Sequence, residues 1–351
     1  MRNVILINRG QVFDTEIKPR LDQYKNDNVV LVIDNKLTRK IVGYITKDYE
    51  QKINIITIHE YINKGVVDNM KFDVIIGNPP YQLQVGPNKT QAIWHKVVDK
   101  CLDLLSPGGS MTMIHPSGWR NPSGIFKSLQ ERLKTKKIEY IQMNSIEEGL
   151  KTFGAQIRFD VYHLINEKPT QDHLTKLIGQ DGTIKNVNIS NMDFIPNGNF
   201  DLVDKIIAKP NEEKVEVLYS RSAYGTDKKN MSSEKVGEFK YPCVYSINVD
   251  EIPSYFYSSI KGEHFGTKKF IIPNGDARSI GFIKDINGEY GLTQFSCAIV
   301  EENKEIQETY HKLFRSKEFI SFYNTNLCIG KTQYNWKVLS LFKKDFWKEF
   351  V

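Results

Sequence analysis

Over residues 1–165, short apolar runs alternate with amphipathic stretches. The apolar runs are rich in Val and Ile and nearly continuous, as strands covered on both faces are; they lie at residues 4–7, 29–33, 53–58, 72–76 and 110–114. Residues 15–26 and 90–105 carry apolar side chains at helical spacing instead. The second of these stretches stops at Ser106-Pro107-Gly108-Gly109, a strong helix terminator. The alternation predicts an α/β domain with a mostly parallel sheet and helices on both faces.

The pattern then continues to a change of character near Pro169. A helix is predicted around residues 122–134, a sixth strand at 138–143, and an antiparallel seventh strand at 156–164 that closes a seven-stranded sheet. After Pro169, Asn/Gly/Asp turns separate short aromatic-rich segments, with one helical stretch near 303–319. We therefore predict two domains, at residues 1–168 and 169–351, the second mostly β with a mixed α+β character.

Composition narrows the class of protein. The chain has 351 residues, 40% hydrophobic and 26% charged, which is typical of globular proteins and enough for two domains. It has no apolar stretch of membrane-spanning length, and its N-terminus does not resemble a signal peptide, so a cytoplasmic protein is expected. The four cysteines show no metal-ligand spacing and predict reduced packing thiols and no metal site. A net charge of +6 suits a nucleic-acid partner without identifying one.

The most informative segment is residues 72–81, Phe-Asp-Val-Ile-Ile-Gly-Asn-Pro-Pro-Tyr. A buried strand runs directly into the turn Asn78-Pro79-Pro80-Tyr81. Ligands of open α/β sheets bind at the carboxyl ends of the strands, so this turn is predicted to border a site. The two prolines stiffen the turn. They present backbone carbonyl acceptors but no backbone N–H donors.

Such a turn suits the methylation of an exocyclic amine. The amine nitrogen is conjugated to its ring and is a poor nucleophile. The side-chain oxygen of Asn78 and the carbonyl of Pro79 can hold its two N–H groups and favour a pyramidal nitrogen, without a strong base. Tyr81 is predicted to stack on the base once it is flipped out of the duplex. The alternative is that the four residues form only a rigid exit from the strand.

Residues 72–81 resemble the catalytic motif of amino-methyltransferases, most closely the adenine-N6 DNA methyltransferases of restriction-modification and phage systems. Weaker matches lie at residues 56–62, 105–109 and 113–119. The resemblance covers residues 1–165. It implies a Rossmann-like domain that uses S-adenosylmethionine, with Asn78, Pro79, Pro80 and Tyr81 as catalytic residues, followed by a target-recognition domain that binds double-stranded DNA.

The same resemblance assigns roles to other residues. It implies that Asp34 binds the cofactor ribose and that Glu60 contacts the cofactor adenine, while Asn78 also borders the cofactor. Phe153 resembles the aromatic residue that packs on the flipped base, and Trp119 either lines the cleft or packs beneath it. Asp34 and Glu60 can equally be strand-end acids that cap the following helices, and Phe153 can be a core residue.

The glycine-rich motif of the family departs from its usual form here. That motif normally reads Asp-Pro-x-x-Gly-x-Gly after the first strand, whereas this chain has Asn8-Arg9-Gly10-Gln11. Asn8 and Gly10 are the residues left to border the methionine part of the cofactor. Fewer glycines make a close backbone approach harder. Three interpretations stay open: divergent cofactor binding, a split enzyme whose partner subunit supplies this motif, or a remnant that binds DNA without catalysis.

The second region mixes cations, aromatics and amides at residues 219–230, 268–269, 278 and 330–336. Cations position phosphates, and amides can read base edges, so Lys331 is a predicted substrate contact. A solvated surface explains any single segment equally well. A nuclease partner is also compatible with the resemblance. Methyltransferases of RNA or of a protein glutamine share the Asn-Pro-Pro-Tyr turn and form the second enzymatic alternative.

Overall fold

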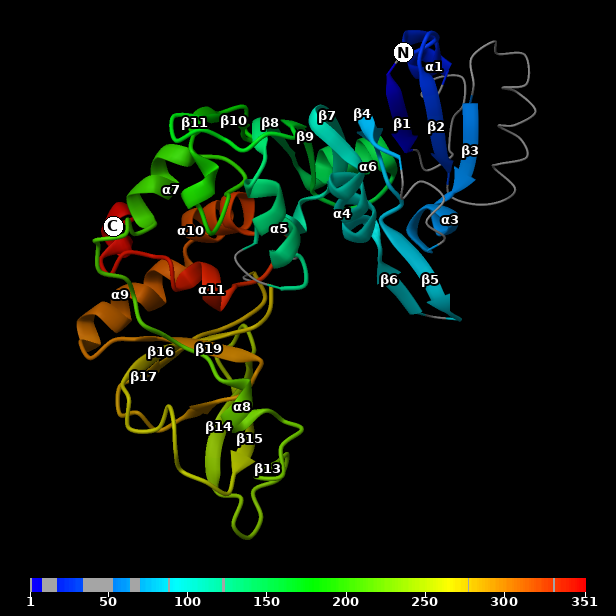
Figure 1. Ribbon diagram of the computed structural model, residues 1–351. Helices are drawn as coiled ribbons and strands as arrows, with labels where there is room; N and C mark the ends of the chain where they lie inside the picture. The colour runs from blue at the N-terminus through cyan, green and yellow to red at the C-terminus, as the bar shows by residue number, and fades with distance from the viewer. Residues whose placement is uncertain are drawn as a thin grey trace. The chain divides into compact units, whose positions relative to one another are not determined.

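The computed structural model describes residues 2–7, 18–33, 53–63, 70–87, 89–121, 124–276, 278–330 and 332–351. The chain forms two compact units, Met1–Ile195 and Pro196–Val351, here called unit 1 and unit 2 (Figure 1). The predicted cofactor residues Asn8, Gly10 and Asp34 and the predicted substrate contact Lys331 lie outside the described residues.

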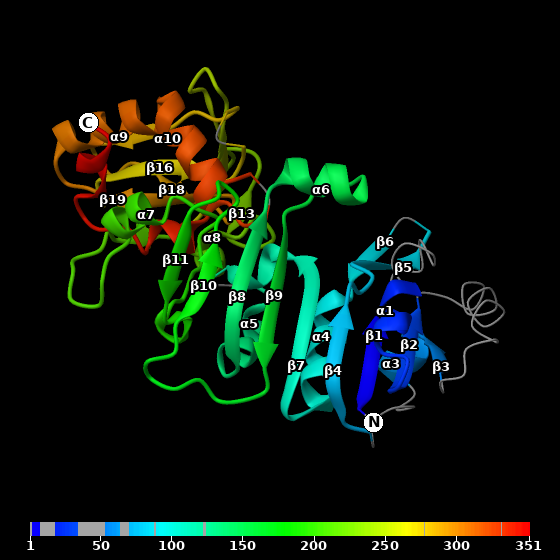
Figure 2. The same ribbon diagram turned by 90° about the horizontal axis from the view of Figure 1, so that it is seen from above.

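Unit 1 is an α/β domain. Its elements are β1 (Asn3–Ile7), α1 (Lys18–Gln23), β2 (Asn28–Ile33), β3 (Ile53–Thr57), α3 (Ile58–Asn63), β4 (Phe72–Gly77), β5 (Gln82–Gly86), β6 (Lys89–Ala92), α4 (Trp94–Leu104), β7 (Leu105–Pro116), a 3₁₀ turn (Ser117–Arg120), α5 (Lys127–Lys134), β8 (Lys137–Asn144), α6 (Ile146–Phe153), β9 (Phe159–Ile165), β10 (Thr175–Ile178), β11 (Ile184–Val187) and a 3₁₀ turn (Ile189–Asn191). The main sheet has the strand order β11-β10-β8-β9-β7-β4-β1-β2-β3 (Figure 2).

The predicted Rossmann-like sheet is confirmed. Within the described part of residues 1–168, seven strands belong to this sheet. Of these, β3, β2, β1, β4 and β7 pair in parallel. Strand β9 is antiparallel to both β7 and β8, as the sequence predicts for the closing strand.

Both faces of this sheet are covered. Val4 and Leu6 of β1 pack with Leu21 of α1 in one apolar cluster. Ile5 and Ile7 point to the opposite face, because side chains alternate along a strand, and they are also fully buried. Continuous burial explains why these strands read as unbroken apolar runs.

The sheet extends past the predicted domain boundary at residue 168. Strand β10 pairs in parallel with β8, and β11 pairs antiparallel with β10, so unit 1 continues to Ile195. The change of composition near Pro169 therefore marks the end of the seven-stranded part and not the end of the compact unit. Short strands with mixed burial leave only a weak periodic signal in the sequence.

The helix predicted at residues 90–105 begins only at Trp94. Residues 89–92 pair instead with β5, forming a two-stranded hairpin directly after Tyr81. Helix α6 is a second element that the strand-and-helix pattern did not reveal.

Unit 2 has the predicted mixed α+β character, but helices contribute as much of it as strands do, so it is not mostly β. Its elements are α7 (Phe200–Ile206), β12 (Val217–Leu218), α8 (Arg221–Tyr224), β13 (Met231–Ser232), β14 (Tyr241–Ile247), β15 (Pro253–Ser258), β16 (Lys269–Pro273), β17 (Ile283–Asp285), β18 (Gly291–Leu292), β19 (Ser296–Val300), α9 (Lys304–Arg315), α10 (Lys317–Phe322), a π-helical turn (Tyr323–Leu327), α11 (Trp336–Leu339) and a 3₁₀ turn (Phe346–Glu349). Two four-stranded sheets, β12-β19-β16-β17 and β13-β15-β14-β18, share an apolar cluster that includes Val244, Ile271, Leu292 and Ala298.

All four cysteines are buried thiols that form no disulfide. Across the described ranges, no three or more His, Cys, Asp or Glu side chains are grouped so that they could hold a metal ion. In the same ranges, none of the helices combines the length and apolarity needed to cross a membrane.

Candidate functional site

The carboxyl ends of four parallel strands meet at one edge of the unit 1 sheet. In the register of the sheet, Ile7 pairs with both Val32 and Gly77, and Ile33 pairs with Thr57. Strands β1, β2, β3 and β4 therefore end level with one another. An open α/β sheet binds its ligands at this edge, so the edge is the place to look for a site.

The turn Asn78-Pro79-Pro80-Tyr81 leaves this edge from β4. The backbone N–H of Asn78 donates a hydrogen bond of 2.9 Å to the carbonyl of Ile7, which ties the turn to the end of β1. Pro79 is buried and Pro80 is half-buried. The preceding Gly77 leaves no room for a side chain, since an added Cβ would lie 2.6 Å from the Met113 sulfur.

The side chain of Asn78 has an unusual polar environment. Its Oδ1 atom is buried and accepts no hydrogen bond from any described residue. Most buried polar atoms in proteins have a partner, and leaving one unpaired costs roughly 1–3 kcal/mol. A buried, unpartnered acceptor at the end of a central strand is what a site needs if it is to hold an N–H group of a ligand.

Two of the predicted base-contacting residues, Tyr81 and Phe153, lie together. The rings of Tyr81 and Phe153 meet edge to face, with centroids 5.9 Å apart, and Phe153 meets Phe159 in the same way at 4.9 Å. Tyr81 is only 8% exposed. The carbonyl of Tyr81 accepts a hydrogen bond from the N–H of Ile93, which holds both ends of the β5–β6 hairpin together.

Helix α6 brings Phe153 to this position, and its ends carry recognisable capping signals. The Ser145 side chain accepts a hydrogen bond of 3.2 Å from the N–H of Glu148, and Gly154 ends the helix in a left-handed conformation with φ of 65°. The sequence Ser145-Ile146-Glu147-Glu148 matches a capping box, and Gly154 matches a C-terminal glycine cap. These signals were available in the sequence and predict the helix.

Trp119 lies beneath the site and does not line it. Its side chain is completely buried, and its indole N–H donates a hydrogen bond of 2.8 Å to Oδ2 of Asp160. The Arg120 guanidinium donates to the same oxygen at 2.8 Å and to the Ile195 carbonyl at 2.8 Å. This buried ion pair locks the turn after β7 to β9, and sequence spacing alone could not pair residues so far apart.

His115 completes the supporting layer under the site. Its ring stacks on Trp94 with centroids 4.3 Å apart, and its two ring nitrogens lie 3.0 Å from the Tyr162 hydroxyl and 3.0 Å from the Pro116 carbonyl. Burial lowers the pKa of His115 to about 4, so the ring is neutral near pH 7. Its contacts are those of a structural residue, as expected for a histidine without a triad or metal pattern.

Glu60 is engaged in a local interaction. One carboxylate oxygen accepts hydrogen bonds of 2.8 Å from the N–H and 3.0 Å from the hydroxyl of Thr57, and the Glu60 N–H donates back to that hydroxyl at 3.3 Å. Thr57 and Glu60 thus form a capping box at the start of α3. The helix-capping interpretation of Glu60 accounts for these contacts, and the position of Glu60 at the strand edge keeps it beside the site.

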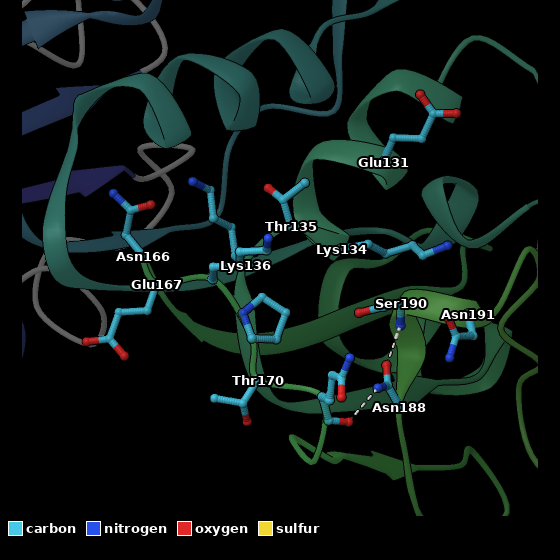
Figure 3. A pocket seen from close by; sticks show the side chains of 13 residues that line it. Glu131, Lys134, Thr135, Lys136, Asn166, Glu167, Thr170, Asn188, Ser190 and Asn191 are labelled. Atoms are coloured by element: carbon cyan, nitrogen blue, oxygen red, sulfur yellow. Dashed lines mark hydrogen bonds between the residues drawn. The ribbon is translucent and has the colours of Figure 1, made fainter.

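One cavity of unit 1 lies away from Asn78. It measures about 1050 Å³ and is lined by Lys134, Asn166, Lys168 and Asn188 among others (Figure 3). Its residues flank the start of β8 and the end of β9, where Lys137 pairs with Ile165, whereas Asn144 and Phe159 pair at the opposite edge. The cavity therefore borders the sheet edge opposite to Asn78 and is not part of the candidate site.

Among the cations singled out in the second region, most are already paired. Lys269 is fully buried and bonded to Asp285, so the expectation that it positions a phosphate is wrong: it stabilises the interior of unit 2. Arg278 pairs with Asp276, and Arg221 with Asp227. Lys228 and Lys229 are exposed, and no ion pair to another described residue is formed by either.

Known proteins match the part of the chain that contains the candidate site. Residues 6–148 match the family model of the Eco57I restriction-modification methylase, a range that contains Asn78 and Tyr81. A protein of Mycoplasma pneumoniae described as an uncharacterized adenine-specific methylase is 39% identical over 111 residues, which are 28% of this chain and 26% of that protein. The chain thus aligns with about a quarter of that relative's length. The resemblance stated for residues 72–81 is confirmed.

Solved structures that resemble the chain share less sequence identity with it. The methyltransferase subunit of a type I restriction-modification system from Streptococcus thermophilus aligns with a TM-score of 0.39 and 12% identity, over 53% of this chain and 44% of that one. A putative class I S-adenosylmethionine-dependent methyltransferase from Listeria monocytogenes aligns with a TM-score of 0.37 and 14% identity, over 50% and 59% of the two chains.

Proposed function

We propose that this chain, whose residues 6–148 match the Eco57I restriction-modification methylase family, methylates N6 of an adenine extruded from duplex DNA. The methyl donor proposed is S-adenosylmethionine. One observation carries the proposal: the buried Oδ1 of Asn78 has no hydrogen-bond partner among the described residues and sits on a stiff turn at the carboxyl end of β4. An acceptor held in this way is ready for an amine N–H.

Asn78 and Pro79 would act on the amine. The Asn78 side-chain oxygen accepts one N–H and the Pro79 carbonyl accepts the other, which draws the nitrogen lone pair out of conjugation. Because both acceptors are preorganised, they stabilise the developing positive charge without reorganising at the moment of reaction. The new N–C bond would form as the bond between the methyl group and the donor sulfur breaks. No general base is required for this step, because the nitrogen would lose its excess proton to solvent water only after the methyl group has arrived.

The cofactor would lie along the same edge. When bound, S-adenosylmethionine supplies an electrophilic methyl group. Asn8, Gly10, Asp34 and Glu60 are the residues proposed to hold it, because all four belong to or follow β1, β2 and β3. Glu60 also caps α3 through its hydrogen bonds with Thr57, which fix its position at this edge.

Cofactor binding tests the unusual glycine motif. Calorimetry with S-adenosylmethionine should detect binding, and Asp34→Ala should weaken it by at least about tenfold, because two hydrogen bonds to a charged group are lost. Arg9→Ala, the matched control next to Asn8 in the sequence, should change the affinity much less. Absence of heat at millimolar cofactor, with DNA present and with DNA absent, would favour a split enzyme or a non-catalytic DNA-binding protein.

Tyr81 is proposed to hold the extruded base by stacking. Tyr81→Ala should weaken binding of DNA that carries the target adenine by about 1–3 kcal/mol, the usual contribution of a base–aromatic stack. Tyr81→Phe keeps the ring and should be mild, so it is the matched control. The measurement is fluorescence anisotropy with labelled duplex, and equal losses in the two variants would contradict a stacking role.

Unit 2 is proposed to contribute the phosphate contacts through its unpaired cations. The affinity of the full chain for duplex DNA should fall steeply with salt, since each phosphate contact releases counterions. Replacing Lys228 and Lys229 with Ala should lower the slope of log K against log salt by up to about 2. Lys344→Ala is the control, because that ammonium already pairs with Glu213. A binding constant that does not change with salt would contradict DNA as the partner.

The class of molecule that receives the methyl group tests the proposed function. Purified chain and radiolabelled S-adenosylmethionine are incubated separately with duplex DNA, with ribosomal RNA and with a glutamine-containing protein. The proposed function predicts label in DNA alone. Label in RNA or in protein instead would assign the chain to the other enzymes that share the Asn-Pro-Pro-Tyr turn.

A further inference from the structure

Loops of unit 2 that lie far apart in sequence converge on one small pocket. Its cavity measures about 220 Å³. It is bounded by residues at the ends of β12 and β16 and at the starts of β19 and α11. The lining residues are Tyr219, Pro273, Asn274, Gln294, Ser296, Cys297, Gln333, Tyr334, Asn335 and Trp336. None of these side chains is charged at neutral pH, so the pocket suits a neutral group better than a phosphate or a carboxylate.

The first feature of this pocket is a flat aromatic platform. The ring of Tyr219 stacks on the indole of Trp336, with centroids 4.8 Å apart and planes inclined by only 14°. Both residues are half-buried, so the platform is partly open, although the Lys337 ammonium also lies over the Trp336 ring, 5.3 Å from its centroid. Asn335 caps α11 by accepting a hydrogen bond of 3.0 Å from the N–H of Lys337, which fixes the position of Trp336. A rigid, partly open π surface favours a flat heterocycle.

The second feature is a set of polar groups around the platform. The side-chain amides of Asn274 and Gln333 form no hydrogen bond with any other residue that the structure describes. Gln294, in contrast, is fixed by two hydrogen bonds with Thr226, of 2.8 and 2.7 Å. The pocket thus combines a fixed wall with two amides that each offer donors and an acceptor, the groups that pair with base edges.

The third feature is a buried hydroxyl. Tyr334 is only 4% exposed, and its hydroxyl finds no hydrogen-bond partner within the described part of the chain. Buried hydroxyls are normally paired, and an unpaired one is destabilising. Since Tyr334 lines the pocket, a ligand with a hydrogen-bonding edge would satisfy it.

We propose that this pocket of unit 2 binds a single nucleobase, stacked against the Tyr219–Trp336 pair and hydrogen-bonded by Asn274, Gln333 and Tyr334. The cavity is smaller than the roughly 300–1,000 Å³ of pockets for drug-sized ligands, so it fits one ring system and not a larger molecule. This base is separate from the adenine at Asn78. The inference rests on the proposed function only for the source of the base, which is either a DNA strand or a free nucleotide.

The test uses tryptophan emission of the full chain. The probes are the four deoxynucleoside monophosphates, with deoxyribose 5-phosphate as a probe that lacks a base. At least one nucleotide should quench the emission saturably, and the quenching should disappear in Trp336→Leu. It should persist in Trp347→Phe, which removes the other tryptophan that is not fully buried. Tyr334→Phe removes only the unpaired hydroxyl and should weaken binding about threefold to tenfold without lowering the melting temperature.

Short single-stranded oligonucleotides identify the source of the base. Tighter binding of an oligonucleotide than of its mononucleotide, reversed by a single abasic site, assigns the pocket to DNA; equal affinities assign it to a free nucleotide. The proposal is overturned if no base quenches Trp336 at millimolar concentration, or if deoxyribose 5-phosphate quenches equally. Because Asn78→Ala leaves this pocket intact, base binding in that variant without methyl transfer separates a failure of the proposed function from a failure of this inference.

Discussion

Asn78→Ala should reduce the rate of methyl transfer to DNA by about a hundredfold or more, the usual cost of losing one preorganised acceptor in a reaction site. Affinity for DNA should be nearly unchanged, because the acceptor acts on the amine in the transition state and not on the duplex as a whole. Single-turnover transfer of labelled methyl groups measures the rate, and anisotropy with the same DNA measures the affinity.

The same variant should fold at least as well as the wild type. The Asn78 side chain has a buried oxygen that bonds to none of the described residues, so its removal relieves a polar group that they leave unsatisfied. A residue that lowers stability while it supports activity is expected at a reaction site. Loss of activity together with a large loss of stability, or full activity in Asn78→Ala, would contradict the role given to this residue.

Asp160→Ala should lower the free energy of unfolding by about 3–5 kcal/mol, the typical cost of removing one partner of a buried ion pair. Asp160 and Arg120 are completely buried, and the carboxylate also accepts from the Trp119 indole. The substitution would leave the buried guanidinium without its counter-charge and would remove the acceptor of the indole N–H. Urea denaturation followed by far-UV circular dichroism measures the loss.

Asp99→Ala is the matched control for this effect. Asp99 and Arg132 form an ion pair of similar length, 2.9 Å against 2.8 Å, but their side chains are 31% and 39% exposed. Exposed pairs contribute about 0–1 kcal/mol, so this variant should be nearly as stable as the wild type. Equal losses in the two variants would mean that burial does not determine the strength of the Asp160 interaction.

Much of unit 1 could be predicted from the sequence, because its strands are buried on both faces and read as apolar runs. The parallel strands β1 to β4 and the antiparallel β9 lie where the pattern predicts them, and the strand ends bring Asn78 to the expected edge. The polar turn at the end of an apolar strand was equally visible in the sequence.

Other features depend on contacts that periodicity does not encode. The β5–β6 hairpin is exposed, and its Leu83 and Val85 are not buried in a core. Strands β10 and β11 are too short for a periodic signal. The pairing of Asp160 with Trp119 and Arg120 joins residues about 40 positions apart. Lys269 looked like a surface cation, yet tertiary packing buries it against Asp285. The α6 capping signals are present in the sequence, but they are short and lie between two predicted strands.

The identity of the methylated nucleoside tests the central claim most directly. Unmethylated genomic DNA is incubated with the chain and radiolabelled S-adenosylmethionine, digested to nucleosides and separated by chromatography. The proposed function predicts that the label co-elutes with N6-methyl-2′-deoxyadenosine and that Asn78→Ala removes this peak. Label in a different nucleoside, or no labelled nucleoside from wild-type protein that binds the cofactor, would contradict it.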